Sequence, residues 1–162
     1  MMDSDISIRR AEIQDLTGIK RLADNNRTTL GFVLRPALMA GIKQGWLLIA
    51  EQTNGELLGF IHYRHRRDMQ TTLYEICVAQ SFRRRGVGRA LIEALARESA
   101  QLRKACIQLR APVGIPANAF YQMTGFALDR TESGRKSPLN VWRYPICPVS
   151  YTHLTLPTSD LV

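Results

Sequence analysis

The chain has 162 residues, of which 45% are apolar and 22% are charged. That length suits one compact domain with a sizeable core, and no apolar run approaches the ~20 residues that span a bilayer, so we exclude a membrane span. Lysine and arginine number 22 against 14 aspartates and glutamates, which gives a net charge of +8. This charge favours polyanions such as nucleic acid, acidic lipid or a phosphorylated cofactor without choosing among them.

The two ends of the chain bear on its compartment and its boundaries. The N-terminal MMDSDISIRR lacks the charged-then-apolar order of a secretory signal, and Cys77, Cys106 and Cys147 form no spaced metal motif. We therefore expect a cytoplasmic protein with no metal and no membrane partner. The last fifteen residues, PVSYTHLTLPTSDLV, resemble a translated sequencing-adapter read-through, with a disordered tail as the alternative. We predict one domain over residues 1–147 and a non-native or disordered tail over 148–162.

Hydrophobic periodicity predicts the elements of the first half of the chain. Alternation over 6–10 indicates a strand, and apolar residues at helical spacing indicate helices over 15–25 and 35–43. Apolar runs at 46–50 and 57–63 flank Asn54-Gly55, a strong hairpin signal, and so predict an antiparallel pair. Residues 71–78, rich in β-branched and aromatic side chains, predict the next strand after a polar turn.

The second half predicts a crossover followed by a hairpin. Leu91, Leu95, Ser99 and Leu102 fall on one helical stripe from residue 88 onward. A strand at 105–109 then lies parallel to 71–78 by the usual right-handed crossover. A short helix over 116–124 ends at Gly125, and strands at 126–131 and 139–144 follow. We predict an α/β (α+β) fold with a mixed, mostly antiparallel central sheet of about seven strands flanked by about four helices.

Residues 78–90, VAQSFRRRGVGRA, are the strongest candidate for an anion site. They lead from a strand into a helix N-terminus, where free N–H groups and about half a positive charge attract anions. Gly86 and Gly88 are expected to take positive φ, and the arginines add charge-assisted hydrogen bonds. No Gly-Lys-Ser/Thr follows for a P-loop, and Leu91 stands where a dinucleotide fingerprint needs glycine or alanine. We predict a pyrophosphate cradle; the alternative is a tight turn with solvated arginines.

Two motifs in this region carry a family resemblance. V-x-x-x-x-R-x-x-G-x-G-x-A, read as Val78, Arg83, Gly86, Gly88 and Ala90, is similar to the acetyl-CoA signature of the GCN5-related N-acetyltransferases (GNAT). Ala117-x-x-x-Tyr121-x-x-x-Gly125-Phe126 resembles the later helix motif of that family. The resemblance covers about residues 6–145. It implies the GNAT fold, with strands 71–78 and 105–109 splayed apart, and acetyl-CoA as co-substrate without a metal.

The resemblance also implies which residues bind the cofactor. Backbone groups at the end of strand 71–78 would pair with the pantetheine arm, and the loop amides would hold the pyrophosphate. The implied residues are Ile76, Cys77, Val78, Arg83, Arg84, Arg85, Gly86, Val87, Gly88, Arg89 and Ala90. Family members often have asparagine seven residues before the tyrosine, where this chain has Gly114, so one cofactor contact is in doubt. Asn118 lies nearby, with helix capping as its simpler interpretation.

Tyr121 and Glu75 are the implied catalytic residues. In the family, the tyrosine hydroxyl often protonates the departing CoA thiolate; the alternative for Tyr121 is an aromatic core residue beside Phe120. The acceptor amine must be neutral to attack, which at pH 7 costs about 4.6 kcal/mol for a lysine-like amine, so a base is useful. Glu75 is the candidate base, directly or through water, and pairing with Arg64 across the hairpin is its alternative.

The remaining candidates for a catalytic role are two histidines and two cysteines. His62 and His65 are weaker base candidates, expected to be exposed and solvated on the hairpin. Cys77 and Cys106 are interpreted as small buried residues rather than nucleophiles, which favours direct attack by the amine in a ternary complex.

Three segments, 26–34, 62–68 and 132–137, correspond to the acceptor loops of the family, and each carries a net positive charge. They suit a small-molecule or peptide amine that carries acidic or phosphate groups, and Phe32, His62 and Arg64 are candidate substrate-binding residues. A homodimer is compatible with the resemblance. The alternatives are a basic nucleic-acid-binding module, which the motifs disfavour, and a non-catalytic CoA-binding sensor with the same fold.

Overall fold

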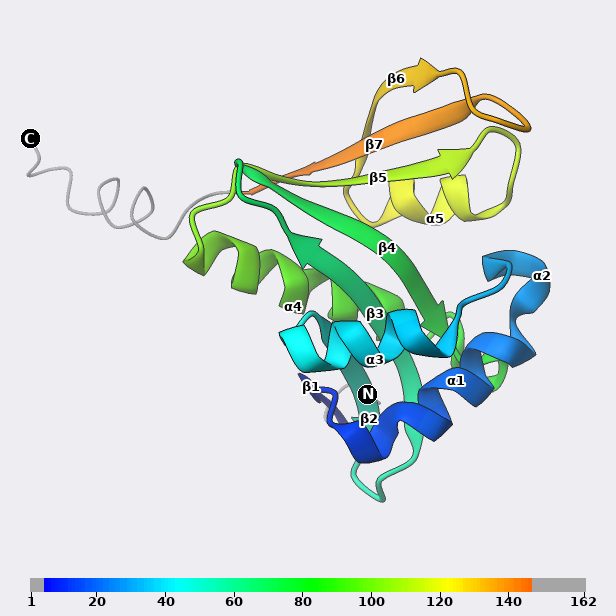
Figure 1. The fold of residues 1–162 in the computed structure, drawn as a ribbon, viewed down its shortest axis with the longest axis vertical. Helices are drawn as coiled ribbons and strands as arrows, with labels where there is room; N and C mark the ends of the chain where they lie inside the picture. The colour runs from blue at the N-terminus through cyan, green and yellow to red at the C-terminus, as the bar shows by residue number, and fades with distance from the viewer. Residues whose placement is uncertain (1–4, 147–162) are drawn as a thin grey trace, which may run out of the picture. The chain divides into compact units, whose positions relative to one another are not determined.

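The computed structural model describes residues 5–146, so Cys147 and the predicted tail over 148–162 lie outside the described residues. Within that range, strands and helices follow the order that the periodicity predicts (Figure 1). The elements are β1 (Ile6–Arg10), η2 (Ile13–Asp15), α1 (Leu16–Asn25), α2 (Arg27–Leu30), α3 (Arg35–Gln44), β2 (Leu47–Gln52), β3 (Leu57–His65), β4 (Gln70–Val78), η3 (Gln80–Phe82), α4 (Val87–Gln101), β5 (Cys106–Pro112), α5 (Ala117–Met123), β6 (Ala127–Glu132) and β7 (Leu139–Pro145).

The strands form one mixed sheet in the order β1-β2-β3-β4-β5-β7-β6. β2 pairs antiparallel with both β1 and β3, and β7 pairs antiparallel with both β5 and β6. β4 and β5 are parallel, in register from Gln70 opposite Cys106 to Thr72 opposite Gln108. The predicted fold class, a mostly antiparallel sheet of seven strands with one parallel crossover, is therefore confirmed. The splay of β4 and β5 beyond this register stays a prediction.

The chain divides into two compact units, Met1–Arg64 with Leu73–Ala94 and His65–Thr72 with Leu95–Val162. β4 and α4 each run from one unit into the other, and each unit has a buried core of its own. The single domain over residues 1–147 stays a prediction.

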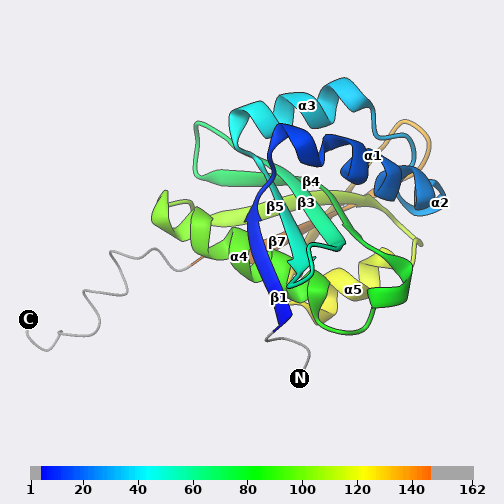
Figure 2. The same ribbon diagram turned by 90° about the horizontal axis from the view of Figure 1, so that it is seen from below.

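The core of the first unit lies under α1 and α3. The helical spacing of Leu16, Ile19 and Leu22 buries one stripe of α1. This stripe shares a hydrophobic cluster with Leu38 of α3 and Phe60 of β3. Figure 2 shows α1 and α3 together on one face of the strands of this unit. The two helices thus cover the face of the sheet on which Cys77 of β4 is buried in the same cluster.

The core of the second unit contains the C-terminal half of α4 and the β5–β7 pair. Ser99 of α4 is completely buried, as the predicted stripe requires, and Trp142 of β7 lies opposite Leu109 of β5. Leu102 departs from the prediction, because α4 ends at Gln101 and the Leu102 side chain in the following turn is 52% exposed.

Three single turns, η2, α2 and η3, were not predicted. A segment of three or four residues spans about one helical period, so its sequence carries no periodic signal. The last two adjoin segments of interest, because α2 leads toward Phe32 and η3 opens the arginine-glycine loop.

Candidate functional site

The loop between β4 and α4 holds two left-handed residues just before the helix begins. Arg84 and Gly86 take φ of +65° and +85°. The Ala90 N–H donates to the Gly86 carbonyl at 2.9 Å and makes the first hydrogen bond of the helix. The N–H groups of Val87 and Gly88, in the first turn of α4, therefore have no intrahelical acceptor. Such a turn before a helix N-terminus is a backbone arrangement that can bind an anion.

The conformations of the two glycines differ from the expectation. The prediction of positive φ at Gly88 is wrong, because this residue is the second of α4 and is buried in helical conformation. The second left-handed position is the non-glycine Arg84. A Cβ atom at Gly86 would meet no atom within 4 Å, so glycine is favoured there by its backbone angle rather than by space.

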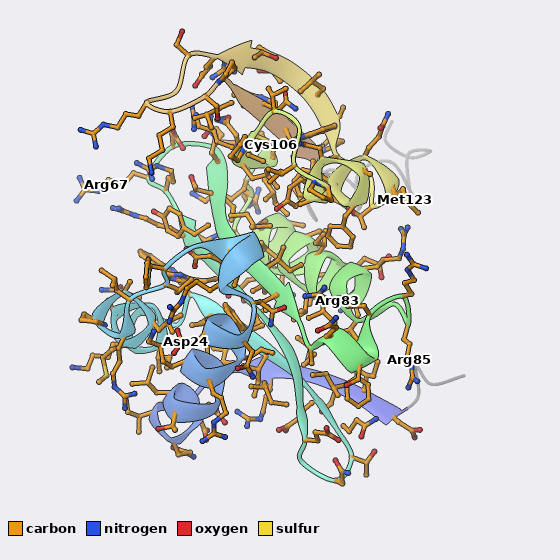
Figure 3. All side chains as sticks on the ribbon, turned by 90° about the vertical axis from the view of Figure 1, so that its right-hand side faces the viewer. Asp24, Arg67, Arg83, Arg85, Cys106 and Met123 are labelled. Atoms are coloured by element: carbon orange, nitrogen blue, oxygen red, sulfur yellow. The ribbon has the colours of Figure 1, made fainter. Side chains whose placement is uncertain are left out.

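The arginine side chains of the loop point in different directions. Arg83 turns back onto the protein, donating from Nε to the Val78 carbonyl at 3.1 Å and from Nη2 to the Asn26 carboxamide oxygen. The Arg85 guanidinium lies over the Phe82 ring, 5.4 Å from its centroid, and Arg84 is exposed. In Figure 3, Arg83 lies on the side of the loop nearer α1 and Arg85 on its outer side. Arg83 is thus bound to the end of β4 and the C-terminal end of α1, whereas Arg84 and Arg85 are exposed and place positive charge at the surface of the loop.

Glu75 and His62 form a pair on neighbouring strands of the first unit. His62 Nδ1 and Glu75 Oε1 are 2.8 Å apart, and the Tyr74 ring lies 5.3 Å from the imidazole. His62 is only 8% exposed, so the expectation of a solvated hairpin histidine is wrong for this residue. The alternative partner Arg64 instead lies over the Trp46 ring, 5.7 Å from its centroid.

The other edge of the His62 ring faces the backbone of α3. A Cβ atom at Gly41 would stand 2.6 Å from His62 Nε2 and 2.8 Å from Cδ2, so only glycine leaves room for the imidazole. Because one edge of the ring is occupied by Glu75 and the other by α3, His62 is poorly placed to receive a proton from a ligand. The Glu75 side chain is 25% exposed and is the more accessible member of the pair.

The side chain of His65, in the second unit, is only 8% exposed, and the residue as a whole is half-buried. Its Nδ1 lies 2.8 Å from Thr71 Oγ1 and its Nε2 lies 2.6 Å from Glu98 Oε2, while Thr71 Oγ1 lies 2.9 Å from Ser99 Oγ. The expected exposure of this histidine is therefore wrong as well. The four side chains tie the start of β4 to α4, which is a structural arrangement and gives His65 no open nitrogen.

Both described cysteines are buried, as predicted for small core residues. Burial raises the pKa of Cys77 to about 11, against a smaller opposing effect of the Arg83 charge. At neutral pH about one Cys77 thiol in 10⁴ is then ionised. Burial also raises the pKa of Cys106. Neither side chain presents the thiolate that a nucleophile needs.

Tyr121 is held on α5 of the second unit by the way the helix ends. The Gly125 N–H donates to the Gln122 carbonyl and the Phe126 N–H to the Tyr121 carbonyl, with φ of +114° at Gly125, which is the Schellman pattern. The accompanying hydrophobic contact is between Tyr121 and Phe126, whose rings are 5.8 Å apart. Burial raises the pKa of Tyr121, so its hydroxyl stays protonated at neutral pH.

Asn118 has a structural role one helical turn before Tyr121. Its Oδ1 accepts from Trp142 Nε1 at 2.7 Å, and its Nδ2 donates to the Pro112 carbonyl at 2.9 Å. The Trp142 ring in turn lies 6.4 Å from the Tyr121 ring. Gly114 takes a φ of +94° in the preceding turn, which glycine accommodates without strain. The capping interpretation of Asn118 is wrong, because the N-cap of α5 is Pro116 and the Asn118 oxygen accepts from Trp142 and Asn140 instead of a helix N–H. Its amide nitrogen donates to the Pro112 and Ile115 carbonyls, so these contacts leave no free group for a cofactor.

The candidate substrate residues differ in accessibility. Phe32 is 74% exposed, beneath the Arg27 guanidinium at 4.5 Å from its ring centroid, and Arg64 is exposed. His62, the third candidate, is buried with Glu75. The turn after β3 is held by Lys104, whose Nζ donates to the carbonyls of Arg66 and Asp68.

Within residues 5–146, no helix has the length and apolar character needed to cross a bilayer. No group of three or more His, Cys, Asp or Glu side chains in the same part of the chain is arranged to hold a metal ion. The first unit thus brings together the loop, Arg83, Cys77, Glu75 and His62, whereas Tyr121 belongs to the second unit.

Comparisons with known proteins agree with the fold. The family model "Acetyltransferase (GNAT) domain" matches residues 43–128, more than half of the chain, and no curated protein matches. Ard1 from Thermoplasma volcanium superposes with a TM-score of 0.76 at 19% identity, covering 88% of this chain and 99% of that one. The ribosomal-protein-S18-alanine N-acetyltransferase from Escherichia coli gives 0.71 at 22%, covering 87% and 94%. YncA from Salmonella typhimurium, solved with its cofactor acetyl-CoA, gives 0.72 at 16%, covering 88% and 95%.

Proposed function

Because this chain belongs to the GNAT acetyltransferase family, we propose that it transfers an acetyl group from acetyl-CoA to a primary amine. The observation that carries the proposal is the β4–α4 loop, where two left-handed residues precede the N–H groups of Val87 and Gly88, which have no intrahelical acceptor. A diphosphate needs several converging donors and positive charge, and this loop offers both. Acetyl-CoA supplies the activated acyl group as a thioester.

The cofactor would be held along one continuous segment of the first unit. Main-chain groups of Ile76, Cys77 and Val78 would pair with the pantetheine arm. The N–H groups from Arg84 to Gly88 would hold the pyrophosphate, with the exposed Arg84 and Arg85 guanidiniums adding charge. Binding by backbone donors explains why a glycine stands at the left-handed position 86, since Gly86 adopts a φ of +85° without strain.

Glu75 is the proposed acceptor for the proton that the amine loses. Its Oε1 is occupied by His62 at 2.8 Å, which fixes the carboxylate while the side chain remains partly exposed. The amine nitrogen attacks the thioester carbon, the C–N bond forms, and the proton passes to Glu75 directly or through one water. Removing a proton from the amine offsets the unfavourable neutral fraction at pH 7.

Tyr121 is the proposed donor to the departing thiolate. Its raised pKa keeps the hydroxyl protonated, but it also makes complete proton transfer to a thiolate of pKa about 8.5 unfavourable by at least about 2 kcal/mol. We therefore assign to Tyr121 a hydrogen bond that stabilises the sulfur as the C–S bond breaks, rather than net donation of its proton. That Tyr121 and Glu75 serve one thioester is part of the proposal.

Direct attack in a ternary complex is the proposed mechanism. The alternative, an acetyl-cysteine intermediate, needs a thiolate, and the raised pKa of buried Cys77 opposes its formation. The chain's own residues thus act on the amine proton and on the leaving sulfur, and none of them forms a bond to the acetyl group.

The acceptor is proposed to be a peptide or small-molecule amine with acidic or phosphate groups. The Escherichia coli neighbour acts on an alanine of ribosomal protein S18, which makes peptide N-termini a reasonable acceptor class. The exposed Arg64 and Phe32 offer a cation and an aromatic surface for such a ligand. We place this activity in the cytoplasm and expect weak turnover of polycationic aminoglycosides.

Two experiments test the proposal. Calorimetric titration of the full chain with acetyl-CoA should give saturable binding, and a hundredfold excess over Kd should stabilise the fold by about 2.7 kcal/mol. CoA release should then be measured against N-terminal peptides, lysine peptides, acidic amines and kanamycin. A nucleic-acid-binding module would instead show salt-dependent affinity for DNA or RNA and no stabilisation by acetyl-CoA. A CoA sensor would bind acetyl-CoA and turn over none of the amines.

A further inference from the structure

We propose that Asn26 is a positioning residue for the cofactor loop and that it acts through Arg83. This inference rests on the proposed function and deepens it. It assigns Arg83 to shaping the loop, in place of the direct phosphate contact that its position in the signature suggests. Asn26 lies at the C-terminal end of α1, 57 residues away from Arg83 in the sequence.

A chain of contacts links the C-terminal end of α1 to the end of β4. Asn26 Nδ2 donates to the Leu22 carbonyl at 2.8 Å, and Asn26 Oδ1 accepts from Arg83 Nη2. Arg83 Nε donates to the Val78 carbonyl at 3.1 Å. The Cys77 thiol, next to Val78, lies 4.0 Å from the same Leu22 carbonyl. All of these residues belong to the first unit.

Asn26 and Arg83, the two central residues of this chain of contacts, differ in burial. Asn26 is 8% exposed, and its amide nitrogen and oxygen each have a partner within the chain, so it is poorly placed to bind a ligand from solution. Leaving a buried amide oxygen unpaired is unfavourable, which gives Asn26 a strong preference for keeping Arg83 in place. Arg83 itself is exposed, so without Asn26 its guanidinium would be free to move into solvent.

The position of Arg83 in the chain explains the effect on the loop. The bond from its side chain to the Val78 carbonyl joins residues five apart in the sequence, and Asn26 fixes that side chain to α1. Arg84, the first left-handed residue of the anion-binding turn, follows immediately. The direction of the N–H groups that precede α4 therefore depends on where Arg83 is held. Preorganised donors bind an anion more tightly than donors that must first be ordered.

The alternative is that Arg83 contacts phosphate directly when CoA is bound. In that case the Asn26 contact competes with the cofactor, and removing Asn26 would leave CoA affinity unchanged or raise it. If Asn26 works through Arg83, removing either residue weakens CoA binding, and removing both weakens it no further. The two possibilities thus predict opposite outcomes for the same substitution.

A double-mutant cycle on the full chain distinguishes them, with CoA Kd measured by calorimetry. We expect Asn26→Ala and Arg83→Ala each to raise Kd about tenfold and the double variant to match the larger single effect. Asn25→Ala is the matched control, because Asn25 is an exposed neighbour of the same residue type, and its Kd should equal that of the wild type. Independent effects in the double variant, or an unchanged Kd for Asn26→Ala, would overturn the proposal.

Two conservative variants keep the test decisive if an alanine variant folds poorly. Asn26→Asp retains an acceptor for Arg83 and should restore most of the affinity. Arg83→Lys retains the charge but cannot reach two acceptors at once, so it should bind CoA as weakly as Arg83→Ala. Full CoA affinity of Arg83→Lys would instead identify a charge contact with phosphate. If the wild-type chain binds no CoA, the proposed function fails; if only the variants behave unexpectedly, the role of Asn26 fails.

Discussion

The β4–α4 loop of the first unit and the Tyr121 helix of the second unit are built on different physical principles. In the loop the proposed functional groups are main-chain N–H groups, and their direction depends on left-handed backbone at Arg84 and Gly86. On α5 the proposed functional group is one side chain, held by a Schellman ending and by packing against Phe126 and Trp142. Substitutions that change backbone angle or charge should therefore disturb the loop most. Removal of a single oxygen atom should be enough to disturb the site on α5.

The largest effect should come from Gly86→Glu in the loop. The new carboxylate would stand where the cofactor diphosphate must bind, and the side chain would strain a φ of +85°. We expect the acetyl-CoA Kd to rise more than about a hundredfold. Gly55→Glu is the matched control, because Gly55 has a φ of +89° and an equally open Cβ position in the β2–β3 turn. Equal Kd values for the two variants would contradict an anion site in the loop.

Tyr121→Phe tests the second site by removing one oxygen. We expect kcat to fall about 10–100-fold with acetyl-CoA binding unchanged, since the hydroxyl stabilises charge that develops only on the leaving sulfur. Tyr144→Phe is the control, because its ring also packs against Phe126, at 5.2 Å. Steady-state kinetics and a CoA titration measure both quantities. A normal kcat for Tyr121→Phe would leave this residue a packing role only.

Gly41→Ala tests whether the Glu75–His62 pair of the first unit depends on the close packing of α3 against the imidazole. The added methyl would stand 2.6 Å from His62 Nε2 and displace the imidazole that holds Glu75. We expect kcat to fall about tenfold while the CoA Kd stays constant, because the base but not the loop is disturbed. Gly18→Ala in α1 is the control. Its Cβ would make an ordinary 3.6 Å contact with Leu57, so we expect a gain in stability of about 0.5–1 kcal/mol.

Cys77→Ala should have little effect on catalysis. The thiol is buried and its pKa is raised to about 11, so we expect kcat to change less than about threefold and iodoacetamide not to inactivate the enzyme at neutral pH. Stability should fall by about 1 kcal/mol for the lost sulfur contacts. Loss of activity in a variant that remains folded would favour a covalent acetyl-cysteine and overturn direct attack.

The smallest expected effect is on the free energy of unfolding in acid. It can be compared between Asp15 of the first unit and Glu132 of the second. Hydrogen bonds from Arg9 hold the pKa of Asp15 below its usual value, so the folded form gains stability at pH values above about 4 and loses it as pH falls. Asp15→Asn should lower the free energy of unfolding at pH 7 by about 1 kcal/mol and flatten its fall below pH 4. Arg110 and Arg130 likewise lower the pKa of Glu132, an exposed residue, and Glu132→Gln should change stability less. Urea titrations between pH 2 and pH 7 measure both.

Much of the fold was predictable because its signals are local. Alternation over 6–10, the Asn54-Gly55 hairpin and the strand-helix-strand order at 71–109 each depend on neighbours within one or two elements. The position of the loop before α4 was predictable for the same reason, since the glycines, the arginines and the start of the helix lie within thirteen residues. The anion site in this loop stays a prediction. The errors of detail arose where an element begins or ends. Positive φ was expected at Gly88 but occurs at Arg84, and Leu102 was expected on the buried stripe of the helix but is exposed.

The side-chain environments were not predictable, because they depend on residues distant in the chain. The sequence indicated an anion-binding loop and the type of residues that serve acetyl transfer. Only tertiary structure decided that Glu75 meets His62, that Gly41 makes room for that ring, and that Asn26 holds Arg83. Backbone preferences act between neighbouring residues and can be recognised in a short segment. Side-chain partners are chosen by the packing of elements against one another, which a single sequence does not display.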